Sequence, residues 1–297
     1  MINIIKLIFL VIILYRLIST FCDNYEISYN QVKKFIDKDD NYKYTIGPLP
    51  YSNTKYYKSE TKRFYKFIDI LDKIKHVEYS NNNRYEQNKM SIKIDFFKRN
   101  NVLNFNLLED FVRYANYKNI MVGFAAMKDK DKDEELDTYI KLIKLGYKNI
   151  FITLATYRSD VSERVDYVLK HNGVVRLVKG WYKDGDVKSW DKVTELYFIN
   201  AKKLIETNNY HILATHDFNI LEKLYDIYGQ NRMNNIEIIF FSFSKKFVTK
   251  KLKKFKYEIK HKSFYKPYGK VCLSFMYTLK NMSIWRDFQR RYIGKVK

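Results

Sequence analysis

The sequence predicts an α/β fold, a (β/α)₈ TIM-like barrel that forms a single domain after an N-terminal hydrophobic leader. Two observations lead to it. Eight short apolar runs alternate with amphipathic segments of helical spacing, which is typical of a parallel sheet. Eight such units in a chain of 297 residues suit a barrel of about 250 residues, whereas a doubly wound sheet has fewer strands and a glycine-rich first turn.

The eight predicted strands are runs rich in β-branched and aromatic residues. In chain order they cover residues 44–46, 91–97, 120–126, 149–155, 174–180, 210–216, 235–242 and 257–264. The 9 glycines are scattered and form no GxGxxG, P-loop or GxSxG motif, so nucleotide-binding and hydrolase signatures are missing from the sequence.

The predicted helices place apolar residues three and four positions apart. In residues 61–76 this spacing puts Phe64, Phe67, Ile68 and Leu71 on one face. The other helices with this pattern cover residues 134–145, 161–171, 189–207 and 218–228.

The leader, residues 1–22, predicts a signal peptide or a signal anchor. A short segment with one lysine precedes the apolar run 7–15 (LIFLVIILY), and small residues follow it. The run is short for a membrane span, yet residues 4–18, flanked by lysine and arginine, would also serve as an anchor. We therefore expect the secretory pathway or membrane association through the N-terminus, with a mitochondrial location as the runner-up. Residues 23–40 are predicted as a helical arm, and residues 41–297 as the barrel with a C-terminal basic helix.

The composition limits the partners and metals of this chain. A net charge of +22 suits a nucleic acid or an anionic membrane. The basic pairs at 245–246, 250–251 and 253–254 sit among apolar residues at helical spacing, however, so we interpret them as solvated helix faces and expect no nucleic-acid partner. Two cysteines cannot build a disulfide scaffold or a four-thiolate zinc site, and no metal site is predicted.

Residues 176–182 (RLVKGWY) carry the strongest candidate chemistry, because active sites of such barrels lie at the carboxyl ends of the strands. An arginine that points into a barrel loses hydration and needs an anionic or electron-rich partner. Arg176 could be such a functional group, or a structural cation paired with Glu237. Lys93 could be functional or simply extend to solvent, and Asp217 precedes a helix that it is expected to cap.

Five segments resemble, in order, the motifs of one family. Residues 91–94 (SIKI), 176–182 (RLVKGWY), 214–217 (ATHD), 236–238 (IEI) and 265–269 (YKPYG) are similar to the strand motifs of the proline dehydrogenases. These are flavoenzymes with a distorted (β/α)₈ barrel, and the resemblance covers about residues 40–282. It implies FAD as cofactor, L-proline or an analogue as substrate, 1-pyrroline-5-carboxylate as product and a quinone as electron acceptor.

The resemblance also implies roles for single residues. Arg176 matches an arginine near flavin N5, and Tyr182 and Tyr265 match aromatic residues that wall the proline site. The implied catalytic residues are Lys93, Arg176, Tyr182 and Tyr265, and the implied cofactor-binding residues are Lys93, Arg176, Val178, Thr215 and His216.

Several positions depart from the family pattern. Thr278 and Leu279 stand where the family has paired arginines for the proline carboxylate, and Trp181 replaces a small alanine. Gly123 falls at a third-strand aspartate and Leu154 at a fourth-strand glutamine. Three hypotheses follow: a flavin-dependent proline oxidase, an inactive barrel with a binding or secreted interaction role, and a basic protein that binds polyanions by charge alone.

Overall fold

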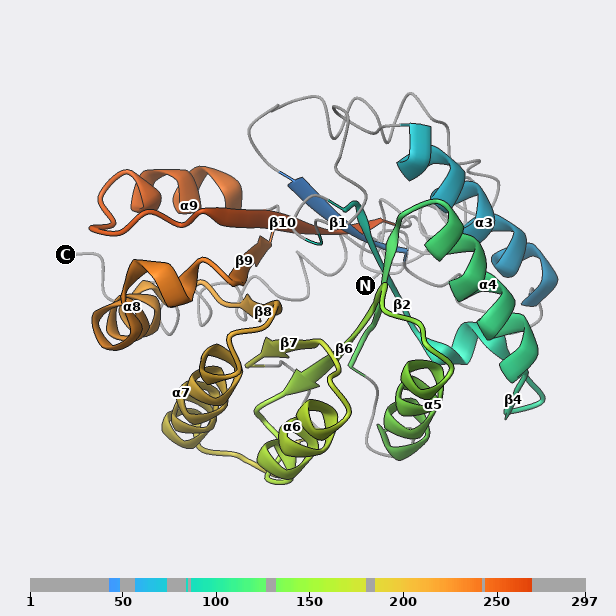
Figure 1. Ribbon diagram of the computed structural model, residues 1–297, viewed down its shortest axis with the longest axis horizontal. Helices are drawn as coiled ribbons and strands as arrows, with labels where there is room; N and C mark the ends of the chain where they lie inside the picture. Colours follow the sequence, from blue (N-terminus) through green and yellow to red (C-terminus); the bar gives the residue numbers. More distant parts are fainter. Residues whose placement is uncertain are drawn as a thin grey trace, which may run out of the picture.

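Eight parallel strands close into a barrel, and helices lie around its outside (Figure 1). This computed structural model describes residues 43–48, 57–73, 84, 87–126, 132–179, 185–241 and 244–268. The α/β barrel predicted from the sequence is therefore confirmed. The predicted leader, the helical arm at 23–40 and the C-terminal basic helix lie outside the described residues.

The order of strands around the barrel is β1, β10, β9, β8, β7, β6, β5 and β2, so the first strand joins the last to the second. Six residue pairs align β1 with β10, beginning at Lys43 and Ser263, whereas two pairs align β1 with β2. The strands are β1 (Lys43–Pro48), β2 (Lys89–Ile92), β5 (Met121–Phe124), β6 (Ile150–Ala155), β7 (Val175–Val178), β8 (His211–Ala214), β9 (Ile236–Phe241) and β10 (His261–Tyr268).

Seven α-helices of the described part pack on the outer face of the strands, where the largest buried apolar cluster lies. They are α3 (Tyr57–Lys73), α4 (Phe105–Tyr117), α5 (Lys132–Lys144), α6 (Val161–Lys170), α7 (Trp190–Glu206), α8 (Phe218–Met233) and α9 (Lys245–Leu252). None of the helices in these ranges is both long and apolar enough to cross a membrane. Two of them, α4 and α9, are absent from the predicted set.

A second, smaller cluster fills the barrel interior. Strand alternation sends every other side chain inward, which places Met121, Phe151, Tyr210, Ile212 and Ile239 together at the barrel axis. The interior of the barrel is therefore packed with side chains, as expected for eight strands.

The predicted strand at 91–97 is wrong in its second half. The strand ends at Ile92, and η2 (Ile94–Phe97) is a 3₁₀ turn. Its apolar residues Ile94, Phe96 and Phe97 are all buried, and Phe64 of α3 lies 4.8 Å from the Phe96 ring. The apolar run thus reflects a buried turn, followed by the short hairpin β3 (Lys98–Arg99) and β4 (Val102–Leu103).

The last strand begins later than predicted, at His261 rather than residue 257, because residues 253–260 form the connection from α9. Three earlier helices, α4, α6 and α7, are each followed by an asparagine with positive φ: Asn119 (56°), Asn172 (55°) and Asn208 (56°). Asparagine tolerates this left-handed conformation and is used to end helices.

Candidate functional site

Arg176 lies inside the barrel, where β7 directs its side chain toward the axis. Its Nε donates a hydrogen bond to Thr153 Oγ1 (2.8 Å) and its Nη2 to Ser91 Oγ (2.9 Å). The rings of Phe151 and Tyr265 lie 5.1 and 5.4 Å from the guanidinium carbon. Hydroxyls from two strands and two electron-rich rings therefore surround this cation, which is only 6% exposed.

Glu237 is not the partner of Arg176. It lies near the start of β9, at the amino end of the barrel, and pairs with Lys89 at 2.9 Å. Tyr210 donates a 2.6 Å hydrogen bond to the same carboxylate, and Ser263 donates another. Burial alone would raise the pKa of Glu237, but Lys89 and these hydrogen bonds outweigh it and hold the pKa below its usual value. The group is a satisfied ion pair at the end of the barrel that faces away from a TIM-type active site.

Two glycines make room for the rings beside Arg176. A Cβ on Gly123 would come within 2.1 Å of the Phe151 ring, and a Cβ on Gly47 within 2.0 Å of the Tyr265 hydroxyl. The Phe151 ring thus takes the space beside the position that matches the family's aspartate. Tyr265 is half-buried; burial raises its pKa, and the nearby Arg176 acts in the opposite direction.

The predicted position of the fourth-strand glutamine needs a correction. Leu154 belongs to the apolar cluster between strands and helices, and Thr153 is the β6 residue that faces inward to Arg176. The correct match is one residue earlier because side chains alternate along a strand. Thr153 and Ser91 are site residues that sequence reasoning did not identify as partners of Arg176; counting the alternation along β6 and β2 would have found both.

Lys93 and Val178 lie at the carboxyl ends of their strands. Lys93 directly follows β2 in extended backbone, so it shares the inward face of Lys89 and Ser91. It is half-buried, and among the described residues none holds its ammonium group by a hydrogen bond or an ion pair. Val178 is half-buried and shares the face of Arg176 on β7. Tyr182 lies outside the described residues, as do Trp181, Thr278 and Leu279.

Thr215, His216 and Asp217 connect β8 to α8. Asp217 caps the helix by accepting a hydrogen bond from the Ile220 N–H at 3.3 Å, as predicted, and it also pairs with Lys179 at 2.9 Å. Thr215 Oγ1 accepts a hydrogen bond from the Asp217 N–H at 3.0 Å.

His216 is buried between the ends of β8 and β9. Its Nε2 accepts the Phe241 N–H at 3.0 Å and lies 2.7 Å from Ser244 Oγ. Burial lowers the pKa of His216 to about 3, so its imidazole is neutral at physiological pH. The ring therefore braces the strand ends as a neutral hydrogen-bond acceptor.

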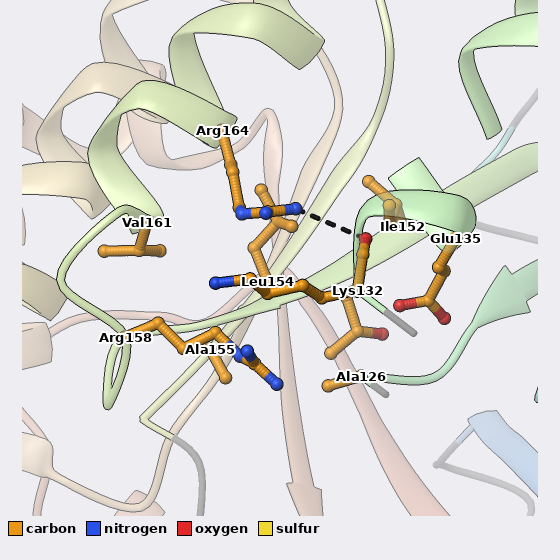
Figure 2. Close-up of a pocket in the computed structure, with 10 residues that line it drawn as sticks. Ala126, Lys132, Glu135, Ile152, Leu154, Ala155, Arg158, Val161 and Arg164 are labelled. Atoms are coloured by element: carbon orange, nitrogen blue, oxygen red, sulfur yellow. Dashed lines mark hydrogen bonds between the residues drawn. The ribbon is translucent and has the colours of Figure 1, made fainter. Parts of the chain in front are cut away.

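A small cavity lies beside the barrel mouth, between the first turns of α5 and α6 (Figure 2). Its volume is about 20 Å³, enough for one water molecule. Arg158 lines it, and Arg164 closes it by donating to the Lys132 carbonyl (3.3 Å) and to Asp160 Oδ2 (2.8 Å). The cavity is too small for a flavin or an amino acid, and its ionic lining joins the two helices. Among the described residues, no group of three His, Cys, Asp or Glu side chains could hold a metal ion.

Comparison with known proteins finds the same fold in solved structures. No family model matches the chain, and no curated protein matches it. Proline utilization A (PutA) from Bdellovibrio bacteriovorus, inactivated by N-propargylglycine, superposes with a TM-score of 0.69 and 18% identity over 85% of this chain and 31% of that chain. A PutA mutant from Bradyrhizobium japonicum (TM-score 0.63, 16% identity, 76% of this chain and 26% of that chain) is also similar. So is PutA from Corynebacterium freiburgense (TM-score 0.60, 11% identity, 93% and 32%).

The chain thus spans about a third or less of the length of these PutA chains. At such low identity the likeness concerns the fold: the described barrel is that of a distant relative in shape of the PutA proteins.

Proposed function

We propose that this chain is a proline dehydrogenase-like flavoprotein that binds FAD at the mouth of its barrel and oxidises L-proline or an analogue. The observation that carries the proposal is Arg176, a cation held inside the barrel by hydroxyls and aromatic rings. The similarity in fold to PutA proteins and the five ordered sequence motifs support it.

The residues at the carboxyl ends of the strands fit a flat ring system. Ala125, Val178 and Ala214 are half-buried and small, which leaves room above the packed interior. Arg176 below them supplies positive charge of the kind that a reduced, anionic flavin requires. When bound, FAD would supply the hydride acceptor that converts proline to 1-pyrroline-5-carboxylate.

The protein side chains would position and stabilise the reactants. Thr153 and Ser91 fix the plane of the Arg176 guanidinium, so this charge needs little reorganisation during the reaction. The ammonium group of Lys93, without a described partner, is available to a substrate carboxylate. Tyr265 would form one wall of the substrate site. By the family resemblance, Thr215 and His216 would lie near the ribose and phosphates of the cofactor, and a quinone would accept the electrons.

A second candidate is a barrel of this fold that no longer oxidises proline and acts through binding or a secreted interaction. The specific observation in its favour is that the Phe151 ring occupies the space over Gly123, where the family pattern has a carboxylate. We also propose a location in the secretory pathway or at a membrane from the leader sequence.

Flavin absorbance of the purified full chain, before and after addition of L-proline, distinguishes the candidates. We expect a yellow protein whose 450 nm band is bleached by proline and which reduces a dye acceptor. Arg176→Met should abolish bleaching, whereas the control Arg113→Met, at an exposed site on α4, should not. A flavin band that proline leaves unchanged would favour the inactive barrel, and a folded chain that takes up no FAD would refute the proposal.

A further inference from the structure

The segment formed by α9 and the loop that follows it, residues 245–260, carries a dense positive charge. It contains eight lysines and one acidic residue, Glu258, and we call it the lysine surface. The other described connections from a helix to the next strand are rich in asparagine instead, as at Asn119, Asn172 and Asn208. The excess of lysine is therefore local to this connection and is not a uniform property of the loops at this end of the barrel.

Most of this charge is not neutralised. Lys256 pairs with Asp226 at 2.7 Å. Five further lysines are exposed, and no described carboxylate lies within ion-pair distance of any of them: Lys246, Lys250, Lys253, Lys254 and Lys260.

The lysines follow one face of the helix. Lys246, Lys250 and Lys253 are spaced four and three residues apart, opposite the fully buried Val248. Like charges at this spacing destabilise a helix by a few tenths of a kcal/mol per pair. A surface that lowers the stability of its own helix calls for a compensating role, and a polyanionic partner would supply one.

The position of the lysine surface suits a membrane. Its loop leads into β10 at the amino end of the barrel, and β1 begins at the same end, because Lys43 aligns with Ser263. The chain that precedes Lys43, which contains the predicted leader, therefore joins the barrel beside these lysines. The mouth above Arg176 lies at the opposite, carboxyl end.

The chemistry of the segment favours lipid headgroups over nucleic acid. All of its cations are lysines and none is an arginine. Lysine is a compact point charge, whereas planar bidentate recognition of phosphate and base edges favours arginine. Polybasic segments near a membrane gain about 1 kcal/mol for each lysine at an anionic surface.

We propose that the lysine surface binds the anionic headgroups of a lipid bilayer and holds the barrel with its mouth directed away from the membrane. This inference does not depend on the proposed oxidation of proline, because it concerns the opposite end of the barrel.

Vesicle sedimentation with the full chain tests the proposal. The protein is mixed with vesicles of phosphatidylcholine alone or with about 30% phosphatidylserine, and binding to the neutral vesicles measures any contribution of the leader. We expect the triple variant Lys250→Gln, Lys253→Gln, Lys254→Gln to lose about 100-fold in its partition onto the anionic vesicles, from about fivefold per lysine. Raising the salt from about 0.05 M to about 0.5 M should remove most of the preference of the unchanged protein for anionic vesicles.

A matched triple variant controls for the loss of charge. Lys144→Gln, Lys148→Gln and Lys170→Gln remove three exposed lysines outside the lysine surface and should leave vesicle binding within about twofold of the unchanged protein. Circular dichroism verifies that both variants are folded. Equal losses in the two variants, or equal binding to neutral and anionic vesicles, would overturn the proposal. So would a duplex oligonucleotide that displaces the protein from vesicles at a lower phosphate concentration than free phosphatidylserine vesicles do.

Discussion

Two buried cations inside the same barrel are compensated in different ways. Lys89 meets the carboxylate of Glu237 at 2.9 Å, with Tyr210 and Ser263 completing the network. Arg176 instead meets hydroxyl groups and aromatic rings. A charge neutralised by a carboxylate has little left to offer a ligand, whereas hydroxyls orient a guanidinium without cancelling its charge. The first cation therefore stabilises the barrel, and the second suits a ligand site.

Replacing Glu237 with glutamine should destabilise the barrel strongly, because the ammonium group of Lys89 would remain buried beside a neutral amide. We expect the free energy of unfolding to fall by about 3 to 5 kcal/mol. The double variant Lys89→Met, Glu237→Leu should regain most of this loss, since it leaves no buried charge. Urea unfolding of the two variants checks the prediction, and a Glu237→Gln protein as stable as the unchanged one would contradict it.

At the scale of elements, the end of β7 is joined to the start of α8 by one side chain with two tasks. Asp217 caps α8 and pairs with Lys179, which is only 3% exposed and also donates to Thr194 on α7. Burial lowers the pKa of Lys179, and Asp217 counteracts part of that effect. The loop above Arg176 thus depends on a helix cap for its anchoring.

Changes at Asp217 should separate the two tasks. Asp217→Asn keeps a capping acceptor but removes the counter-charge, and Asp217→Ala removes both, so alanine should cost about 1 kcal/mol more than asparagine. Thermal or urea unfolding measures the difference. Identical losses in the two variants would show that only the ion pair contributes.

The elements differ in how well the sequence predicts them. All eight barrel strands overlap predicted runs, because buried parallel strands are continuous apolar segments. The run at 91–97 misleads because Phe96 and Phe97 are apolar for packing against α3 and α4, not for pairing in a strand. Arg176 could be predicted from its motif, but the side chains around it could not. Its contacts with Ser91 and Tyr265 join residues 85 and 89 positions away in the sequence, and only the closed barrel brings them together.

For the whole molecule, two buried histidines link stability to pH. Burial lowers the pKa of His211 to about 4 and that of His216 to about 3, whereas both have pKa values near 6.5 when unfolded. The unfolded chain therefore binds more protons below about pH 6.5, and stability is full above this pH and falls as the pH drops toward 4.

Lowering the pH from about 7.5 to about 5.5 should cost the barrel about 3 kcal/mol through these two groups together. A variant with His211→Gln and His216→Gln should lose that much less over the same interval, although it starts from a lower stability. The control His171→Gln, at the end of α6, should behave like the unchanged protein. Urea midpoints at the two pH values measure the effect, and parallel losses in all three proteins would contradict it.

The way β1 joins the ends of the barrel also determines when the molecule can be completed during its synthesis. Six of the residue pairs of β1 are made with β10 and only two with β2, so the strand made first finds most of its partners last. At about 5 to 20 residues per second, the ribosome needs about 15 to 50 s to reach Tyr268. Until then the unpaired edges of β1 and of the growing sheet remain open to other chains. The nascent protein is therefore most exposed to misassembly just before the segment that closes it emerges.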